Sequence, residues 1–231
     1  MIYPCGCHNE LDENSGMIRC VSKCDFQVNA LGNIKSDDAV YYTTLGSIAD
    51  GAPRAKLYIR ELQDSGLFIR PSPSLAQMRR ALEIGCGCSG YVPLLLKLGY
   101  NYYGIDTSDY AVKWTSQAYD DDTYRVSLEE MNGSQRFDLI LAAHVLEHFK
   151  DAPAALVKMY GLLNPGGQLC VIVPNGDDDP TSPDHWWFMT ESSLLSYATR
   201  VGFVDITMNQ RRVVEHERFI YMSASKRGEK S

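Results

Sequence analysis

A glycine-rich stretch between two carboxylates has the clearest chemical meaning in this sequence. Gly85, Gly87 and Gly90 follow an apolar segment that contains Glu83, and Asp106 ends the next apolar segment, 19 residues after Gly87. Glycines let a backbone turn tightly and approach a ligand closely, and the N–H groups where a helix begins favour an anion. A carboxylate at the position of Asp106 can accept both hydroxyls of a ribose. We therefore expect a nucleotide-type cofactor at this loop.

The spacing of the glycines fits more than one cofactor. Gly-x-Gly-x-x-Gly is the dinucleotide-binding pattern, which is weak evidence as a bare string. Dehydrogenases usually have a small or apolar residue two positions before the first glycine, where this chain has Glu83. An NAD-dependent oxidoreductase therefore stays an alternative, and Glu83 argues against it.

A second candidate set follows a long apolar segment at residues 137–143. His144, Glu147 and His148 have the order His-x-x-Glu-His, the inverted zinc-protease pattern, which requires both histidines on one helix and a third ligand. In the simpler alternative, Glu147 and His148 only cap and position the following loop. His185, beside two tryptophans, is a candidate general base because its pKa lies near working pH, and the alternative is an ordinary surface histidine.

Four cysteines crowd the first 24 residues of the chain. Cys5 and Cys7 form one close pair, and Cys20 and Cys24 form another after a short polar stretch. Two close pairs separated by a hairpin are the layout of a zinc ribbon, in which four thiolates complete a tetrahedral structural site. The alternatives are that His8 replaces Cys7, or that a ribbon fold persists without metal.

The elements that must position these groups follow from alternating strand and helix patterns. Strands are expected at residues 80–84, 102–105, 123–126, 137–143, 168–173, 203–208 and 219–225, and helices at 91–98, 110–119, 152–163 and 191–201. Alternation of this kind predicts an α/β fold with a mostly parallel sheet between two helical layers. The last two strands lack a helix between them and are expected as an antiparallel pair at the sheet edge. Residues 1–38 form the cysteine-rich segment, and residues 39–231 form one domain whose first part, to about residue 75, is a helical lead-in.

Composition limits the function classes. The chain has 231 residues and a net charge of −7, which argues against tight non-specific binding of nucleic acid. Its apolar runs are far shorter than a membrane span requires. Seven cysteines, an odd number, without a visible secretory signal favour a reducing, cytoplasmic setting. Nothing in the pattern points to a particular oligomeric state.

Taken together, the motifs resemble those of class I S-adenosylmethionine-dependent methyltransferases over roughly residues 50–225. The first motif of that family matches residues 83–87 and the second matches residues 104–106. Residues 137–140 resemble its fourth strand, and residues 164–167 resemble the turn into its fifth strand. The resemblance implies a Rossmann-like three-layer sandwich with seven strands and S-adenosylmethionine as the cofactor.

The resemblance also implies a role for each matching position. Glu83 would orient the loop and the cofactor ammonium, and Asp106 would hold the ribose. The other implied contacts are Gly85, Cys86 and Gly87 beneath the methionine moiety, Gly90 at the start of the helix, Thr107 beside the adenine, Ser127 and Leu128 at the adenine edge, and Ala143 and His144 under the sulfonium.

Two narrower resemblances concern metals and the acceptor. Ubiquinone-pathway O-methyltransferases, which this part of the chain resembles, carry a metal at a Glu-x-x-Glu-His segment; here His144 replaces the first Glu, while Glu147 and His148 match. Many sugar and small-molecule methyltransferases carry an N-terminal zinc ribbon, which residues 19–26 resemble. The expected activity is O-methyl transfer to a sugar or phenolic metabolite. A methyltransferase-like binding protein without turnover and an RNA methyltransferase guided by the ribbon are the alternatives.

Overall fold

The computed structural model describes residues 69–71, 79–88, 91–119, 122–178, 184–214 and 217–228, together with the backbone of three short strands nearer the N-terminus. Most of the expected helical lead-in, Gly90, and three of the four N-terminal cysteines (Cys5, Cys7 and Cys24) lie outside these described residues. The predictions made for them are therefore carried forward as predictions.

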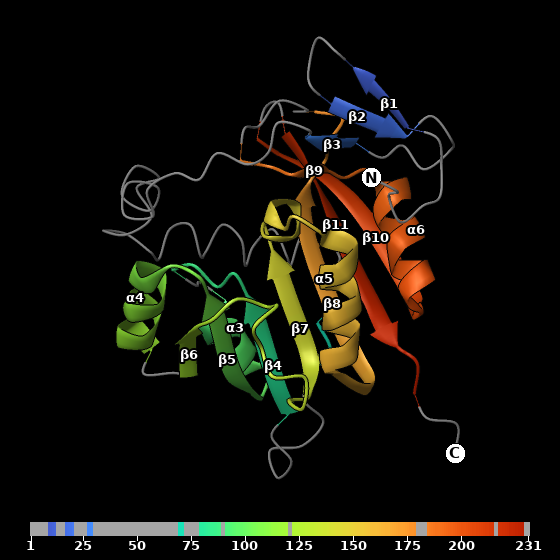
Figure 1. Ribbon diagram of the computed structural model, residues 1–231. Helices are drawn as coiled ribbons and strands as arrows, with labels where there is room; N and C mark the ends of the chain where they lie inside the picture. Colours follow the sequence, from blue (N-terminus) through green and yellow to red (C-terminus); the bar gives the residue numbers. More distant parts are fainter. Residues whose placement is uncertain are drawn as a thin grey trace.

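Seven strands form the central sheet in the order β10-β11-β8-β7-β4-β5-β6 (Figure 1). The strands are β4 (Arg79–Ile84), β5 (Tyr100–Asp106), β6 (Asp122–Arg125), β7 (Phe137–Ala143), β8 (Leu163–Pro174), β10 (Phe203–Val214) and β11 (Glu217–Lys226). Strands β6, β5, β4, β7 and β8 are parallel, whereas β11 is antiparallel to both β8 and β10. The expected mostly parallel sheet with an antiparallel C-terminal pair is confirmed.

Helices cover both faces of this sheet. They are α3 (Val92–Lys97), α4 (Asp109–Tyr119), α5 (Ala152–Leu162) and α6 (Glu191–Val201). Val92 and Leu95 of α3 pack into one apolar cluster, and Leu156 of α5 and Leu194 of α6 pack into the other. Since adjacent side chains of a strand point to opposite faces, Leu139 and Ile140 of β7 belong to different clusters. The expected three-layer sandwich is thus confirmed.

The fifth strand of the parallel set begins earlier than its sequence indicated. We expected a strand at residues 168–173 after an Asn-Pro-Gly-Gly turn, but β8 already starts at Leu163, which pairs with Phe137 of β7. Asn164 remains beside β7 because its side-chain amide donates to Asp138 Oδ1 at 3.0 Å. The ladder absorbs the extra residues as a register shift between Phe137 and Leu139, so the turn forms within the strand rather than before it.

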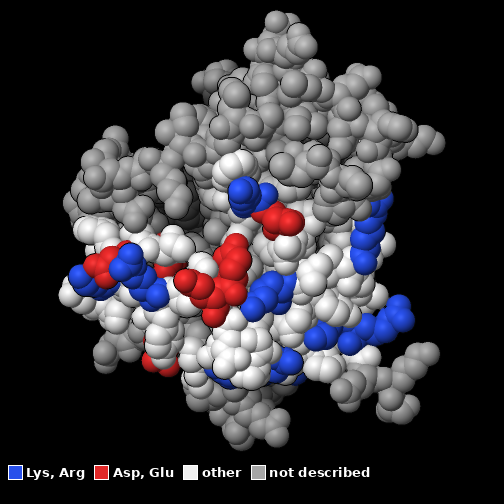
Figure 2. Space-filling view, in the orientation of Figure 1, with Lys and Arg blue, Asp and Glu red and all other residues white. Residues whose placement is uncertain are grey.

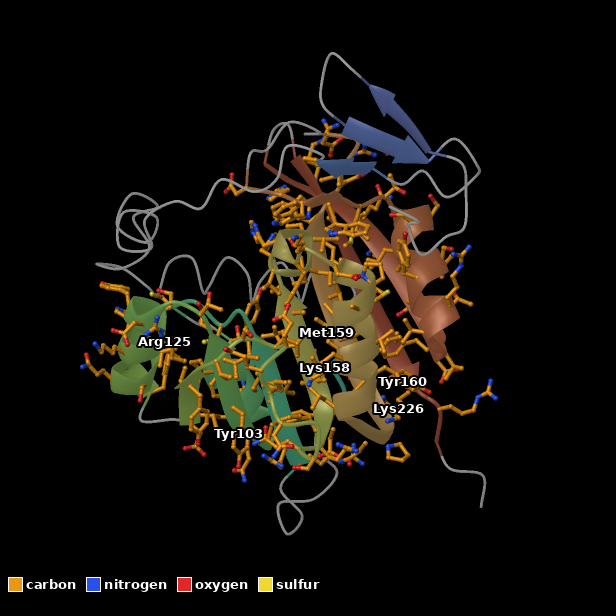
Figure 3. All side chains as sticks on the ribbon, viewed as in Figure 1. Tyr103, Arg125, Lys158, Met159, Tyr160 and Lys226 are labelled. Carbon is orange, nitrogen blue, oxygen red and sulfur yellow. The ribbon has the colours of Figure 1, made fainter. Side chains whose placement is uncertain are left out.

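The end of α5 lies beside the C-terminal strand. Lys226 and Tyr160 are neighbours there (Figure 3), and the Lys226 ammonium lies 4.9 Å from the centre of the Tyr160 ring. Its Nζ donates to the carbonyl oxygens of Tyr160 at 3.0 Å and Leu163 at 2.8 Å. A cation at a helix C-terminus satisfies carbonyls that have no partner within the helix.

A second, smaller sheet has the order β1-β2-β3-β9. Its strands are β1 (Asn9–Asp12), β2 (Met17–Cys20), β3 (Gln27–Asn29) and β9 (Trp187–Phe188). Strand β3 pairs with β2 on one side and with β9 on the other. Strand β9 comes from the part of the chain that resembles a methyltransferase, and the sequence did not indicate this pairing. Of the zinc-ribbon cysteines, the structure describes only the backbone of Cys20, at the end of β2.

The surface and the helices bear on possible partners. On the face shown in Figure 2, Lys and Arg side chains are interspersed with Asp and Glu and form no continuous basic area among the described residues. No helix in the described ranges combines the length and apolar character that crossing a bilayer requires. The expected cytoplasmic setting is carried forward as a prediction.

Candidate active site

The order of the strands reverses its direction between β4 and β7. From β4 the chain crosses to β5 on one side, and later returns to β7 on the other side. Connections that leave in opposite directions from neighbouring parallel strands open a crevice at their carboxyl ends, which is the usual ligand site of such sheets. The glycine loop follows β4 at this edge, and residues 144–148 follow β7.

The glycine loop has the backbone that its glycines permit. Gly85 has φ +63° and Gly87 has φ +52°, both in the left-handed region that side chains other than glycine rarely adopt. Between them, the Cys86 N–H donates to the carbonyl of Ile105 in β5 at 3.0 Å. The loop therefore curls back over the end of β5, toward Asp106.

Asp106 fastens this loop. Its Oδ2 accepts from the Gly87 N–H and its Oδ1 accepts from the Ser108 N–H, each at 2.8 Å, and the residue is only 9% exposed. A carboxylate oxygen can accept more than one hydrogen bond, so Asp106 can hold the loop and also accept from a ligand hydroxyl. Thr115 of α4 adds to the arrangement by donating to the Gly87 carbonyl at 2.7 Å.

Glu83 is held by a partner that sequence reasoning missed. The Tyr102 hydroxyl donates to Glu83 Oε2 at 2.8 Å in the buried interior. Gly104 makes this possible: a Cβ there would lie 2.6 Å from the Tyr102 hydroxyl, so the tyrosine ring lies in the space a side chain would fill. The spacing Tyr102-x-Gly104 on a strand next to Glu83 was the available signal.

The cysteine thiols of this region are shielded. Burial is the main reason that the pKa of Cys86 is raised well above its usual range, and the nearby carboxylates Glu83 and Asp106 raise it further. Burial and Asp106 raise the pKa of Cys88 to about 11. Since the thiolate is the reactive form, these two side chains act as small apolar groups and not as nucleophiles.

The predicted adenine-side residues lie at the far side of Asp106. Thr107 is exposed, and Val126, which precedes Ser127, donates its N–H to the Asp106 carbonyl at 3.1 Å. Ser127 and Glu130 bond reciprocally, with Ser127 N–H donating to Glu130 Oε2 at 3.0 Å. Leu128 is buried in the main core cluster. Their contacts with an adenine stay predictions.

The glycine loop directly touches the segment after β7. A Cβ on Gly85 would lie 2.5 Å from Val145 Cγ2, which is closer than real Cβ atoms approach. Ala143 is half-buried at the end of β7, and His144 follows it with φ +52°. The His144 N–H donates to the Ile172 carbonyl at 2.8 Å and its ring meets Phe219 edge-on at 4.6 Å. The two candidate sets of the sequence therefore form one continuous site.

Three side chains converge just beyond Val145. Glu147 and His148 lie in a 3-10 turn, η1 (Leu146–His148), and His185 lies between β8 and β9. One ligand atom of each, a carboxylate oxygen and two ring nitrogens, lies within 4.8 Å of the other two. The rings of His148 and His185 are 5.0 Å apart and edge-to-face. We call these three residues the acceptor-side cluster.

The contacts of the acceptor-side cluster fix which of its atoms can accept a hydrogen bond or bind a ligand. The Asp184 carbonyl lies 2.8 Å from His148 Nδ1; a carbonyl only accepts, so Nδ1 carries a hydrogen and the neutral ring keeps its lone pair on Nε2. Glu147 is 2% exposed, and burial raises its pKa to about 6, which His148 partly offsets. Among the described residues, Glu147 Oε2 has no hydrogen-bond partner. A buried carboxylate oxygen without a hydrogen-bond partner is costly, so this oxygen is a candidate ligand atom.

This geometry excludes the zinc-protease alternative and places the two tryptophans beside His185. The inverted zinc-protease arrangement is not formed, because the two histidines do not share an α-helix. His144 follows β7 with a left-handed backbone, and His148 lies in a three-residue 3-10 turn. Trp187 is 3% exposed and packs into the main core, so it anchors its loop on the sheet. Trp186 is half-buried beside Lys150, whose ammonium lies 5.9 Å from its ring.

Comparison with known proteins decides the cofactor class. A family model described as a methyltransferase domain matches residues 54–207. The chain belongs to this methyltransferase-domain family. The resemblance to methyltransferases that the sequence indicated is confirmed. The NAD-dependent alternative is set aside. The 1,6-didemethyltoxoflavin-N1-methyltransferase of Burkholderia thailandensis shares the fold, with a TM-score of 0.60 over 89% of this chain and 97% of that one at 16% identity. That protein was solved with S-adenosylhomocysteine bound.

The curated relatives are named for different methyl or carboxymethyl acceptors. A tRNA U34 carboxymethyltransferase of Idiomarina loihiensis is 27% identical over 173 residues, which is 64% of this chain and 51% of that protein. A ubiquinone biosynthesis O-methyltransferase of a Bradyrhizobium strain is 33% identical over 101 residues, 42% of this chain and 40% of that protein. The chain thus spans about half or less of the length of these two relatives.

The contact between Gly85 and Val145 yields a first prediction. Gly85→Ala places a methyl group in the space of Val145 and forces alanine to a positive φ, each of which costs about 1–2 kcal/mol. We expect S-adenosylhomocysteine to bind the variant at least about tenfold more weakly in calorimetry. The double variant Gly85→Ala, Val145→Ala should recover part of this loss.

Gly133→Ala is the matched control, because its new methyl group would meet nothing within 4 Å. It should bind as the parent does. Equal affinities for Gly85→Ala and the parent protein would mean that this loop does not hold the cofactor.

Proposed function

We propose that this protein transfers a methyl group from S-adenosylmethionine to a hydroxyl group of a small molecule, a sugar or a phenolic metabolite. The observation that carries the proposal is the direct contact between the glycine loop and the segment leading to Glu147, His148 and His185. A cofactor held by the first and a hydroxyl held by the second would meet in one crevice. Methyl transfer from a sulfonium is then chiefly a matter of in-line positioning.

The cofactor half of the proposal assigns a task to each described residue. Asp106 accepts from the ribose hydroxyls while it keeps the Gly87 N–H in place. Glu83, oriented by Tyr102, attracts the ammonium of the methionine moiety. Ala143 and His144 lie at the end of β7, where the sulfonium is expected.

The acceptor half concerns one proton. An acceptor hydroxyl must lose its proton as the methyl group arrives, so a neighbouring base speeds the transfer. The Nε2 lone pair of His148 and the ring of His185 are the candidate acceptors of that proton. Glu147 lies within 4.8 Å of both rings and stabilises the positive charge that either one gains.

The same three side chains also suit a divalent cation. One carboxylate and two imidazoles are a common donor set for such ions. Glu147 Oε2, which has no hydrogen-bond partner in the described part of the chain, is the oxygen such an ion would satisfy. A bound ion would polarise the acceptor hydroxyl and lower its pKa. The set differs from the motif expected from sequence, because His185 belongs to the group of three, whereas His144 lies beside that group with its Nδ1 3.9 Å from Glu147 Oε1.

RNA is the second candidate acceptor, and one observation favours it: the relative named as a tRNA U34 carboxymethyltransferase matches 64% of this chain. The net charge of −7 and the interspersed charges of Figure 2 favour the small molecule instead. A structural zinc ion at Cys5, Cys7, Cys20 and Cys24 stays part of the proposal.

The cofactor is tested through Asp106. Asp106→Ala removes a charged acceptor of hydrogen bonds, each worth about 1.5–3 kcal/mol, so S-adenosylhomocysteine should bind about ten- to a hundredfold more weakly in calorimetry. Asp109→Ala, which removes the same charge from an exposed position on α4, should bind as the parent does. Unchanged affinity in Asp106→Ala, or a thermal shift with NAD instead, would remove this assignment.

The acceptor class is tested by transfer of a radiolabelled methyl group. We expect label from S-adenosylmethionine in an O-methyl product of an ortho-diphenol or a nucleotide sugar, and none in bulk tRNA. Label confined to tRNA would replace the proposed acceptor with RNA. The absence of any label, with cofactor binding intact, would favour a binding protein without turnover.

The cation is tested with manganese, followed by electron paramagnetic resonance. Glu147→Gln and His185→Gln should each weaken Mn²⁺ binding at least about tenfold, since each removes a ligand. His144→Gln is the comparison variant: it keeps all three cluster residues and should weaken Mn²⁺ binding less than His185→Gln does. Loss of affinity in His144→Gln but not in His185→Gln would mean that the sequence motif, rather than the cluster, binds the ion. The structural zinc is tested by elemental analysis of the purified protein. Cys20→Ser should lose zinc, whereas Glu147→Gln and His185→Gln should keep it.

A further inference from the structure

The N-terminal strands and the acceptor-side cluster meet at β9. Strand β9 has only two residues, and it pairs antiparallel with β3: Val28 lies opposite Trp187, and Gln27 lies opposite Phe188. Figure 1 shows the three blue strands beside β9 at the end of the molecule where β7 and β8 terminate. His185 lies two residues before β9 in the chain. The N-terminal sheet is therefore joined by backbone pairing to the segment that carries a cluster residue.

The segment from Asp184 to Met189 is fixed from one side by the methyltransferase body. The Trp186 N–H donates to the Glu147 carbonyl at 2.9 Å, and the Asp184 carbonyl accepts from the His148 ring. The Gly176 N–H donates to the Met189 carbonyl at 2.8 Å. A Cβ on Gly176 would lie 2.5 Å from the backbone of Phe188, so this side of β9 is closely packed.

The other side of the segment is fixed by β3. A two-residue strand has little stability of its own and depends on its neighbours. Hydrogen bonding to β3 uses the free edge of β9 and makes it the fourth strand of the N-terminal sheet. His185 thus lies on a short stretch of chain clamped between η1 and the N-terminal sheet.

We propose that β3 is a positioning element of the acceptor side, which holds the backbone of β9 and thereby sets the place of His185 against Glu147 and His148. This inference rests on the proposed function only for the role of the cluster in binding the acceptor or a cation. Groups that bind or catalyse must be held within about 0.5 Å of their working positions, so loss of one clamp should be felt at the imidazole. The N-terminal sheet, through β3, is then a part of the acceptor side.

The test opens the pairing in the full-length protein. Val28→Pro removes an N–H from β3 and disrupts its ladders. Glu10→Pro is the matched control, because β1 is the outer strand of the sheet, where proline is tolerated. Val28→Ile, which keeps a β-branched side chain, is the conservative rescue. The readouts are the ring-nitrogen NMR signals of His185 and His148, assigned with the His→Gln variants, and the affinities for Mn²⁺ and S-adenosylhomocysteine.

We expect Val28→Pro to shift or broaden the His185 signal and to weaken Mn²⁺ binding about tenfold or more, with the affinity for S-adenosylhomocysteine unchanged. Glu10→Pro and Val28→Ile should match the parent protein. A parent-like His185 signal in Val28→Pro, in a sample whose β3 amides exchange rapidly with solvent, would overturn the inference. If Val28→Pro also loses affinity for S-adenosylhomocysteine, the milder variant Val28→Gly is measured instead. A shifted His185 signal in that variant supports the inference, and a parent-like signal overturns it.

These readouts separate the two proposals. If the parent protein binds no Mn²⁺ and methylates nothing, the proposed use of the cluster fails. The NMR signal of His185 still reports whether β3 positions it, because that signal requires neither metal nor turnover.

Discussion

The parallel pairing of β4 with both of its neighbours is the constraint on which the site depends. Strand β4 lies between β5 and β7 and is almost completely buried, with Ala81 and Leu82 at 0% exposure. Its register places Glu83 level with Gly104 on one side and with Leu141 on the other. A slip of one residue would turn Glu83 to the opposite face of the sheet, away from Tyr102. Fixed register is thus what allows a buried carboxylate to have a buried partner.

From this strand the two halves of the site diverge and then meet again. The cofactor half is rigid because its groups bond to each other: Asp106 fastens the loop, and Thr115 holds it from the helix side. The acceptor half is held less directly, since its third member, His185, comes from a different connection than Glu147 and His148. The pairing of β4 with β7 and the close approach of Gly85 to Val145 join the halves, so the geometry between cofactor and acceptor depends on both.

Local pattern predicted most of the fold, and the exceptions have a common physical cause. The strand at residues 137–143 and the helix at residues 191–201 have the predicted bounds, because apolar runs and a helix-ending glycine, Gly202, are local signals. The early start of β8 and the pairing of β3 with β9 were missed. Both depend on partners elsewhere in the chain, and a two-residue strand has no periodicity of its own. The same holds for the site: Glu147, His148 and His185 were each nominated, but their convergence follows only from the folded chain.

The tryptophans give this arrangement an optical consequence. The chain has three: Trp186 and Trp187 flank the acceptor-side cluster, and Trp114 lies on α4 beside Tyr119. Two of the three tryptophans therefore lie on the segment between η1 and the N-terminal sheet, one packed in the core and one half-buried. Their emission depends on how wet and how mobile that segment is. Tryptophan fluorescence therefore reports changes in the packing of this segment without an attached dye.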